Sequence, residues 1–340
     1  MRNTILTLIL LTAMKYMAYA QMDGSGSFLF LDVPVSAMLT GLGGINVSRA
    51  DADVNLLTSN PALVSGELDG YLSLNYVIYP GDIKLSNVSY SQFVSNTGSW
   101  SANLVYFDYG EINSFDDTGA SLGTFNANEY AVTISKSHME GNYRLAVNAK
   151  YAASTIAGYT ASSILFDIGG VFIHPEKDFN AGLVIKNAGF VLKNFTETSN
   201  ITLPFNVQMG MSFKPVHMPV RFSLSIYDIT DWSKANEQAS LVDFKHPTTI
   251  DRFFRHSIFG MEVLAGRHLR LLAGYDHKKR RELKLVNASD GTGFSYGLMI
   301  SVKSFEFGFS RATYHVAGAS NTFTLTSDLK SLITKKRTIE

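Results

Sequence analysis

The 340-residue sequence contains no cysteine, few charged residues and only two tryptophans. Without cysteine, the chain cannot form disulfide bonds, thiolate metal sites or a cysteine nucleophile. Charged residues make up 17% of the chain and the formal net charge is zero, whereas soluble domains have roughly 25% charged residues. A neutral chain gives no support for nucleic-acid binding. Beyond the N-terminus, no apolar run approaches the ~18 residues that a membrane helix needs.

The N-terminus has the features of a secretory signal. Arg2 supplies a positive charge, residues 5–14 are apolar, and Ala18-Tyr19-Ala20 is a small-x-small cleavage site. We therefore predict that residues 1–20 are a signal peptide and that the mature chain begins at Gln21. An exported chain of this kind can cross a membrane only with strands, and strands leave no unpaired backbone in lipid when they close into a barrel.

From residue 71 onward, apolar and polar residues alternate. In residues 143–151 and 205–213, Tyr, Leu, Val, Phe and Met occupy every second position, and more polar or small residues lie between them. A period of two predicts strands with one apolar and one polar face. The apolar face would point inward in a soluble sandwich but toward lipid in a membrane barrel. Alternation alone therefore leaves both architectures open.

The connectors between the predicted strands favour the membrane barrel. Short turns are predicted at residues 95–98, 140–142, 175–177, 215–219, 265–268 and 303–304, and longer connectors at 110–127, 187–201, 231–251 and 278–293. Tight turns at one end and long loops at the other are typical of bacterial outer-membrane barrels. We predict an all-β fold, a transmembrane antiparallel barrel of about 14 strands over residues 71–329. Its long loops face outward, and its short turns and the tail 330–340 lie in the periplasm of a Gram-negative bacterium.

Residues 21–70 lack this alternation. Gly41, Gly43 and Gly44 give the backbone unusual freedom, and they follow no strong strand, which argues against a phosphate-binding loop. Asn60-Pro61-Ala62 looks like a helix start, with Asn as the cap and Pro in the first helical position. We predict that residues 21–35 lead into the barrel and that residues 36–69 form a plug. This plug would lie in the lumen or at its periplasmic mouth, oriented by the Asn-Pro-Ala motif.

The same segment carries a resemblance to a known family. The residues are Asp32-Val33-Pro34-Val35-Ser36-Ala37, Gly41-Leu42-Gly43-Gly44-Ile45-Asn46-Val47, Asp53-Val54-Asn55 and Ser59-Asn60-Pro61-Ala62-Leu63. They resemble the PorV/PorQ family of type IX secretion outer-membrane proteins, and Phe28 to Pro34 is most similar to PorQ. That family is distantly similar to the FadL-type fatty-acid channels, which share an Asn-Pro-Ala element after an N-terminal plug.

The resemblance implies a protein without enzymatic activity or cofactor. PorQ-like barrels belong to an attachment complex that processes secreted cargo and joins it to lipopolysaccharide, and they are thought to hold a surface partner called PorZ. Two other functions on the same fold remain open, namely a FadL-like channel for hydrophobic small molecules and a PorV-like shuttle for cargo. An outer-membrane hydrolase is disfavoured, because the eight histidines show no metal-ligand spacing. His256 and Ser257 are adjacent, and on a strand they would point to opposite faces.

The long loops contain the residues expected to contact a partner. Trp232 and Phe244 lie in the predicted connector 231–251 and offer aromatic contacts. Lys278, Lys279, Arg280 and Arg281 form the densest basic cluster, which would attract lipopolysaccharide phosphates or an acidic partner surface. A solvated loop is the plainer interpretation of this cluster. We predict no catalytic, cofactor-binding or metal-binding residues.

Overall fold

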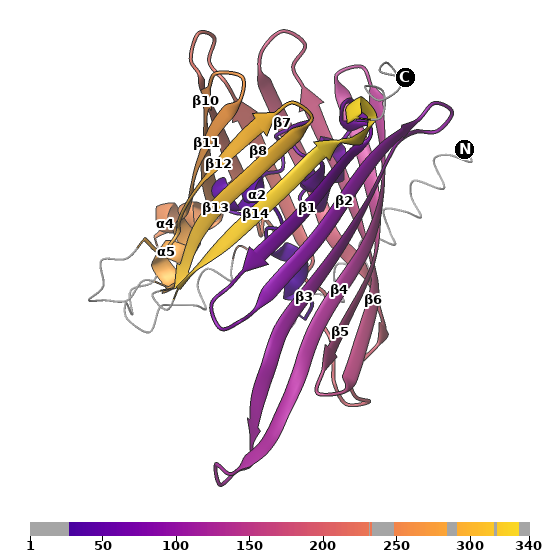
Figure 1. Cartoon of the computed structure of the whole chain (residues 1–340), viewed down its shortest axis with the longest axis vertical. Coiled ribbons are helices and arrows are strands. Elements are labelled where there is room, and N and C mark those ends of the chain that lie inside the picture. Colours follow the sequence, from indigo (N-terminus) through magenta and orange to yellow (C-terminus); the bar gives the residue numbers. More distant parts are fainter. Residues whose placement is uncertain (1–26, 231, 233–247, 284–290, 316–317, 333–340) are drawn as a thin grey trace.

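The computed structural model describes residues 27–230, 232, 248–283, 291–315 and 318–332 (Figure 1). These residues form fourteen strands. The strands are β1 (Tyr71–Ile78), β2 (Lys84–Val94), β3 (Gly98–Phe115), β4 (Ser121–Glu140), β5 (Tyr143–Ile156), β6 (Tyr159–Ile173), β7 (Phe179–Lys193), β8 (Asn206–Phe213), β9 (Val220–Ile226), β10 (Ser257–Ala265), β11 (Leu269–Asp276), β12 (Phe294–Val302), β13 (Phe305–His315) and β14 (Gly318–Asp328).

The strands close into one antiparallel barrel. Each strand pairs with its neighbours in sequence, and β1 pairs with β14 from Tyr71 opposite Asp328 to Ile78 opposite Asn321. Ser73 and Asn75 are buried toward the lumen, whereas Leu74 and Tyr76 on the other face are 45% and 40% exposed. The polar face therefore points inward and the apolar face outward. This orientation confirms the membrane barrel over the soluble sandwich.

The two ends of the barrel differ, as the sequence predicts, although each predicted long connector includes residues of a strand or helix. Residues 187–193 belong to β7, and a helix over Thr249–Arg255 begins within residues 231–251. Residues 110–127 are mostly strand, because β3 and β4 continue as a hairpin whose tip is residues 116–120. Residues 278–293 begin as helix α5 (His277–Leu283) rather than as a loop. We call the end that carries the connections 95–97, 141–142 and 303–304 the short-turn end, and the opposite end the long-loop end.

The long-loop end also contains short connections, of which the turn between β5 and β6 is the tightest in the described residues. β5 and β6 are joined by Ala157 and Gly158 alone, both with positive φ angles of 49° and 84°. Positive φ at both central residues is the geometry of a type I′ hairpin turn. Loop length therefore separates the two ends as a trend, and the difference is carried by the connections after β7, β9 and β11.

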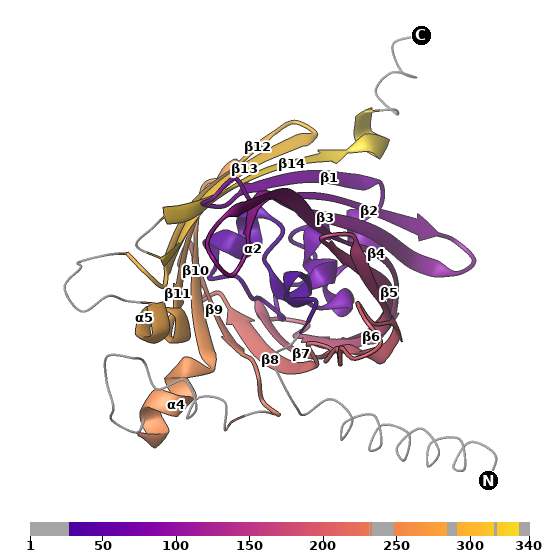
Figure 2. The ribbon, with the colours of Figure 1, turned by 90° about the horizontal axis from the view of Figure 1, so that it is seen from below.

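The lumen is filled by the chain that precedes β1. Five short helices lie in this segment, namely η1 (Leu29–Asp32), α2 (Ala37–Gly41), η2 (Val54–Thr58), η3 (Pro61–Leu63) and η4 (Gly66–Leu68). Seen along the barrel, these helices lie within the ring of strands (Figure 2). Met38, Leu39, Leu56 and Leu57 are at most 2% exposed. The N-terminal plug is thus part of the fold, and we use the word plug for residues 27–69.

Two further helices lie outside the ring at the long-loop end, namely α4 (Thr249–Arg255) and α5 (Figure 2). They contact each other through Asp251, whose carboxylate lies 3.1 Å from His277 Nε2 and 3.5 Å from Arg281 Nε. In the described part of the chain, no helix combines the length and the apolar character needed to cross a membrane.

Candidate functional site

Inward-facing glycines let the plug backbone approach the barrel wall closely. Gly182 of β7 faces the carbonyl oxygen of Val47, and a Cβ atom built at Gly182 would overlap that oxygen. On β11, Gly274 faces the backbone of Leu42 and Gly43 in the same way. A glycine inside a strand often marks the close approach of another backbone. At these glycines, the backbone of the plug therefore lies directly against the backbone of the wall.

Alanine at Gly182 is expected to destabilise the protein, because the added methyl group meets a backbone oxygen that cannot rotate away. Overpacking of this kind costs about 1–3 kcal/mol of unfolding free energy. The matched control is Gly170→Ala on β6, where the nearest atom to the new Cβ is the end of the Leu145 side chain at 3.3 Å. Urea unfolding followed by tryptophan fluorescence measures both variants. Equal losses at the two positions would show that the approach of Val47 is unimportant.

The predicted plug glycines shape the turn after α2. Gly43 and Gly44 have φ angles of 100° and 105°, which favour glycine, and their amides donate to the carbonyl oxygens of Thr40 and Leu39 at 3.2 and 2.8 Å. Gly41 packs on the wall, because a Cβ atom there would lie 2.8 Å from Leu272 Cδ1. These glycines therefore provide a left-handed turn and close packing.

The Asn-Pro-Ala motif starts η3, which agrees with the local prediction. Asn60 is the cap and accepts from the Ala62 amide at 3.0 Å, and Pro61 is the first helical residue. The Asn60 side chain also donates to the carbonyl oxygens of Val47 and Gly170 at 2.9 and 3.2 Å. One side chain thereby joins two plug segments to strand β6. The sequence could indicate the cap but not these two distant acceptors.

Ion pairs fix the plug to three separated strands of the wall. The pairs are Asp32 with Lys186 of β7 at 3.2 Å, Arg49 with Glu262 of β10 at 3.4 Å, and Asp51 with Arg144 of β5 at 2.7 Å. The Arg144 guanidinium contacts both oxygens of Asp51 and also donates to the Ala62 carbonyl at 3.2 Å. These three strands lie within six consecutive strands of the fourteen, so the plug is fixed to this part of the ring at three separate points.

Glu262 is the centre of a larger charge cluster near the short-turn end. Its side chain is 2% exposed, and Arg49, Arg221 and Arg270 lie within 3.5 Å of its carboxylate. Arg221 also pairs with Asp178 at 2.5 Å, and Arg270 pairs with Glu306 at 2.5 Å. Three guanidinium groups thus face three carboxylates, so the cluster carries no net charge. Sequence reasoning missed this cluster, because its members are scattered from residue 49 to residue 306.

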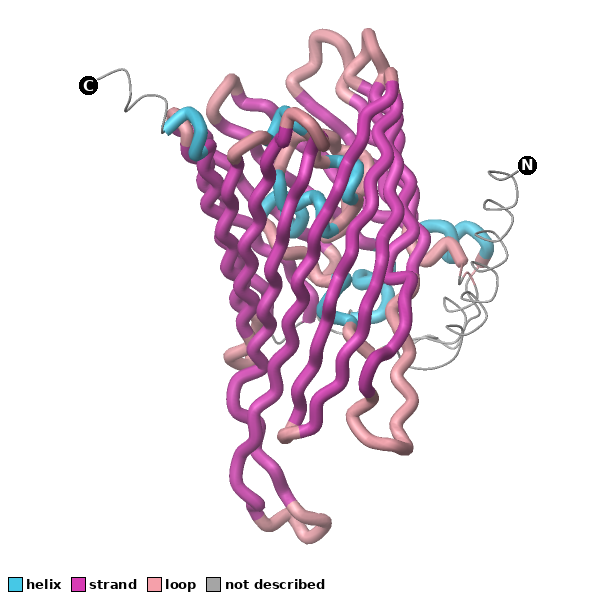
Figure 3. The backbone as a smooth tube through the Cα atoms, turned by 90° about the vertical axis from the view of Figure 1, so that its right-hand side faces the viewer, coloured by secondary structure: helices cyan, strands magenta, loops and turns pink. Residues whose placement is uncertain are grey.

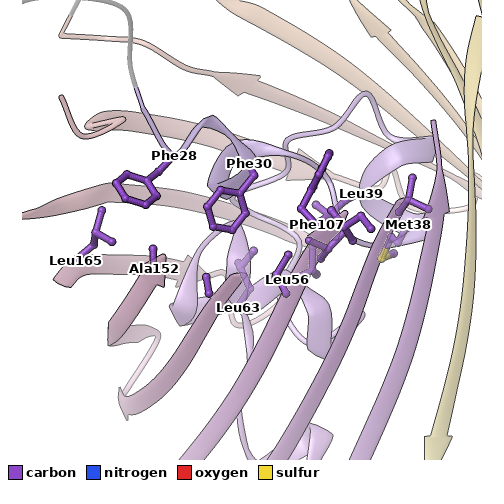
Figure 4. Packing of buried hydrophobic residues seen from close by; sticks show 14 of the residues in the cluster. Phe28, Phe30, Met38, Leu39, Leu56, Leu63, Phe107, Ala152 and Leu165 are labelled. Atoms are coloured by element: carbon purple, nitrogen blue, oxygen red, sulfur yellow. The ribbon is translucent and has the colours of Figure 1, made fainter. Parts of the chain in front are cut away.

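A buried apolar cluster fills the lumen toward the long-loop end. Phe28 and Phe30 are each 2% exposed and belong to one buried cluster with wall residues such as Phe107 and Leu165 (Figure 4). Ile201 and Leu203 of the connection between β7 and β8 belong to the same cluster, and the amide of Ser27 donates to the Thr202 carbonyl between them at 2.9 Å. The plug's own aromatic side chains therefore pack against the wall in this part of the lumen.

The predicted basic cluster lies on α5 and is engaged within the chain. Lys278 pairs with Asp228 at 3.5 Å, and Lys279 pairs with Asp276 at 3.1 Å. Arg280 donates to the Thr292 carbonyl at 3.3 Å, and Arg281 pairs with Asp251. Lys278 and Lys279 also line a cavity of about 280 Å³ that Gly44 reaches from the plug. These contacts hold the helix against the barrel, and they compete with any contact to a partner.

Asp251 stays ionised in this cluster of cations. Burial raises the pKa of its carboxyl group, but hydrogen bonds from Arg255 and His277 outweigh burial and hold the pKa below its usual range. The Arg255 Nε atom lies 2.7 Å from the Asp251 carboxylate. Asp251 is therefore the acidic residue that joins α4 to α5.

Of the two predicted aromatic contacts, one can be placed. Trp232 is 37% exposed, and its ring stacks on His256 with a centroid distance of 4.4 Å. Phe244 lies outside the described residues. Trp232 therefore lies beside the end of α4. None of its described contacts is with a basic side chain of α5.

His256 and Ser257 do not form a nucleophile and base, and the structural reason differs from the predicted one. His256 is the C-terminal cap of α4 and does not lie on a strand. Its Nδ1 atom lies 3.0 Å from the Tyr227 carbonyl, whereas Ser257 Oγ donates to the Phe253 carbonyl at 2.8 Å. Over the described ranges, no group of three or more His, Asp or Glu side chains could hold a metal ion.

Comparison with known proteins finds similar structures but no similar sequences. No model of a protein family matches the chain, and no curated protein matches its sequence. The structure is similar to that of the TodX monoaromatic hydrocarbon channel in a deltaS2 mutant, with a TM-score of 0.51 and 12% identity over 87% of this chain and 97% of that chain. The chain therefore shares the fold of that protein. A Pseudomonas aeruginosa FadL homologue has a TM-score of 0.48 and 12% identity over 86% of this chain and 98% of that chain.

Proposed function

We propose that this barrel is a non-enzymatic component of the type IX secretion attachment complex in the outer membrane. In this role it anchors a PorZ-like surface protein while secreted cargo is processed and joined to lipopolysaccharide. The proposal combines the resemblance of residues 28–63 to the PorV/PorQ family with the position of those residues, which make up most of the plug. Outer-membrane lipid, lipopolysaccharide and other members of the complex are the remaining partners.

The attachment of the plug is the observation that carries the proposal. Passage through the barrel needs a plug that moves, and this plug is joined to β5, β7 and β10 by ion pairs. Leaving one partner of a buried pair uncompensated costs several kcal/mol, so releasing three pairs together is strongly unfavourable. A barrel whose interior is fixed in this way is suited to act as a rigid support.

Isolation of the intact barrel in a mild detergent, followed by mass spectrometry, tests the proposal. We expect a surface protein of the PorZ kind to co-purify in a fixed ratio with the barrel. The matched control is an unrelated outer-membrane barrel from the same cells, isolated with the same tag. If both barrels recover the same proteins, the proposed anchoring role is wrong.

The orientation of the barrel can be tested by labelling. We expect a cysteine at Asp117, in the tip of the β3–β4 hairpin, to react with a membrane-impermeant maleimide on intact cells. A cysteine at Asn96, in the turn between β2 and β3, should react only after the outer membrane is opened. The natural chain contains no cysteine, so the background is clean. Labelling of Asn96 on intact cells would reverse the orientation.

The intact barrel is also expected to conduct few ions. In planar bilayers, its conductance should remain far below that of an open porin, because the described plug fills the lumen with buried side chains. A variant that lacks residues 27–69 is the positive control, provided that it still inserts. Large, stable channels from the intact protein would argue against a rigid support.

A channel for hydrophobic small molecules is the second candidate, and two observations favour it. The first is the buried apolar cluster around Phe28 and Phe30, which gives the lumen an apolar lining there. The second is the end of the β7–β8 ladder at Lys186, beyond which β7 continues along β6 to Lys193. The similar TodX protein is a monoaromatic hydrocarbon channel by name. A PorV-like shuttle for cargo would use the same fold and would bind its partner only transiently.

A disulfide between plug and wall separates the channel from the anchor. The Cβ atom of Ala37 lies 2.9 Å from a Cβ atom built at Gly308, about 1 Å closer than in a typical disulfide. Cysteines at these two positions should lock α2 to β13 after the two backbones move apart by about 1 Å. The Met299 side chain must also turn aside, because its Sδ atom lies 2.6 Å from the Cβ atom built at Gly308. For an anchor, the locked protein holds its partner as well as the reduced protein does. For a channel, hydrocarbon uptake is lost on oxidation and returns with a reductant.

A further inference from the structure

The β3–β4 hairpin leaves the barrel as an isolated two-stranded ribbon. β3 pairs with β2 up to Asp108, and β4 pairs with β5 from Ala127. Residues 111–126 pair only within the hairpin among the described strands, and they extend past the rest of the long-loop end (Figures 1 and 3). We call residues 109–126 the ribbon. Both of its outer edges face solvent except at the base, where the Ala157 amide donates to the Asn126 carbonyl at 3.2 Å.

The base of the ribbon is firmly attached to the barrel. A bulge sets Tyr109 and Gly110 opposite Ala127, and Gly110 has a φ angle of 70°. The Tyr109 hydroxyl donates to Glu129 at 2.6 Å, and its ring packs on Phe107 at a centroid distance of 4.8 Å. A bulge redirects a strand pair and increases its twist. The ribbon is therefore aimed by contacts at its base.

The tip of the ribbon is equally well defined. Asp116 accepts hydrogen bonds from the Thr118 amide at 2.9 Å, the Thr118 hydroxyl at 2.7 Å and the Ala120 amide at 2.8 Å. The hydrogen bonds from Thr118 and Ala120 hold the pKa of Asp116 below its usual range. The tip consequently carries a fixed negative charge at neutral pH.

The surface of the ribbon is acidic, and two exposed apolar side chains lie beside its tip. It contains Glu111, Asp116 and Asp117 and no lysine, arginine or histidine. Phe115 and Leu122 beside the tip are 60% and 67% exposed. A two-stranded ribbon with two free edges is marginally stable alone, and proteins normally cover such edges. These properties indicate that another chain covers the ribbon.

We propose that the ribbon is a docking arm to which a surface protein adds one of its own edge strands. Strand addition supplies backbone hydrogen bonds for affinity, and side-chain contacts supply specificity. The added strand carries lysine or arginine, because the ribbon offers only negative charge. Lipopolysaccharide phosphates have the same sign as the ribbon and are repelled. The proposal rests on the anchoring function and names the surface that performs it.

A synthetic strand serves as the first probe. The probe is a peptide in which lysine alternates with valine and threonine, and it is titrated against the full-length barrel in detergent micelles. A second peptide has the same sequence with N-methyl groups on alternate amides, so that it keeps its charge but loses one row of backbone donors. We expect the methylated peptide to bind about tenfold more weakly or worse. Equal binding of the two peptides would overturn strand addition.

Charge reversal on the ribbon is the second test. Glu111→Lys/Asp117→Lys should weaken binding of the lysine peptide by about tenfold. The matched control is Glu140→Lys/Glu176→Lys, which changes the net charge equally at exposed positions of the short-turn end. If the control weakens binding as much as the ribbon variant does, the site is not on the ribbon.

A shortened hairpin separates this proposal from the anchoring function. Residues 110–126 are replaced by Asn-Gly, which favours a tight hairpin turn and leaves Tyr109 and Glu129 in place. If the intact barrel retains a surface protein and the shortened barrel does not, the docking arm is supported. If both retain it equally, the ribbon is not the arm although the anchor stands. If the intact barrel retains none, the anchoring function itself fails, and with it the docking arm.

Discussion

Glu262→Gln is expected to lower the free energy of unfolding by about 3–5 kcal/mol, the cost of leaving buried charge unpaired. The carboxylate is 2% exposed and contacts Arg49, Arg221 and Arg270. Glutamine keeps the shape of the side chain but removes its charge, so the cluster gains one uncompensated positive charge. Arg49 loses its only described ion-pair partner on the wall. The plug should therefore loosen near the short-turn end before the barrel unfolds.

Two measurements separate loosening of the plug from general instability. Urea unfolding in detergent gives the free energy, and the maleimide reactivity of a cysteine at Ala50, which is 7% exposed, reports the plug next to Arg49. Glu306→Gln is the matched control, because Glu306 pairs with Arg270 but with no described plug residue. If the control exposes Ala50 as strongly as Glu262→Gln does, Glu262 does not hold the plug.

Arg144→Met is expected to have the second largest effect, a loss of about 3 kcal/mol. This arginine is buried in the wall and contacts both oxygens of Asp51, and it also supports η3 through the Ala62 carbonyl. Methionine fills most of the volume but leaves Asp51 without its partner. Because the Asp51 side chain is 20% exposed, water compensates part of the loss, which places the estimate at the low end of the range.

A double-mutant cycle with Asp51→Asn isolates the ion pair. If Arg144 and Asp51 act on each other, the double variant should lose less than the sum of the single variants, by roughly 1–3 kcal/mol. Strict additivity would mean that Arg144 acts through the Ala62 carbonyl or through packing alone. The same variants, carrying a cysteine at Ala62, show by maleimide labelling whether η3 becomes accessible.

The strands could be predicted from the sequence because each one separates lipid from lumen. Leu74 and Tyr76 face outward while Ser73 and Asn75 face inward, so apolar and polar residues alternate along the strand. The ribbon was not predicted as strand, because its two faces do not separate lipid from lumen. Glu111, Asn113 and Thr124 lie where both faces meet water, no alternation is required, and the turn residues around Asp116 made the segment look like a loop.

The candidate site was harder to predict, because its contacts join residues distant in sequence. In the sequence, the basic residues of α5 look like an exposed loop. Their partners are distant, since Lys278 pairs with Asp228, 50 residues away, and Arg281 pairs with Asp251, 30 residues away. The glycines of the wall did offer a signal. Gly182 and Gly274 interrupt otherwise regular strands, and such isolated glycines indicate the approach of another backbone. Their plug partners could be found only in the structure.

The central claim is that this protein holds a surface partner at the outer membrane. The most direct test is the fraction of that partner that remains on cells from which the protein has been deleted, measured by quantitative mass spectrometry of washed cells and medium. We expect the partner to appear in the medium, and both the natural protein and the variant with α2 locked to β13 to return it to the cells. If the partner stays on cells that lack the protein, or if the locked variant fails although it folds, the account of a rigid anchor is contradicted.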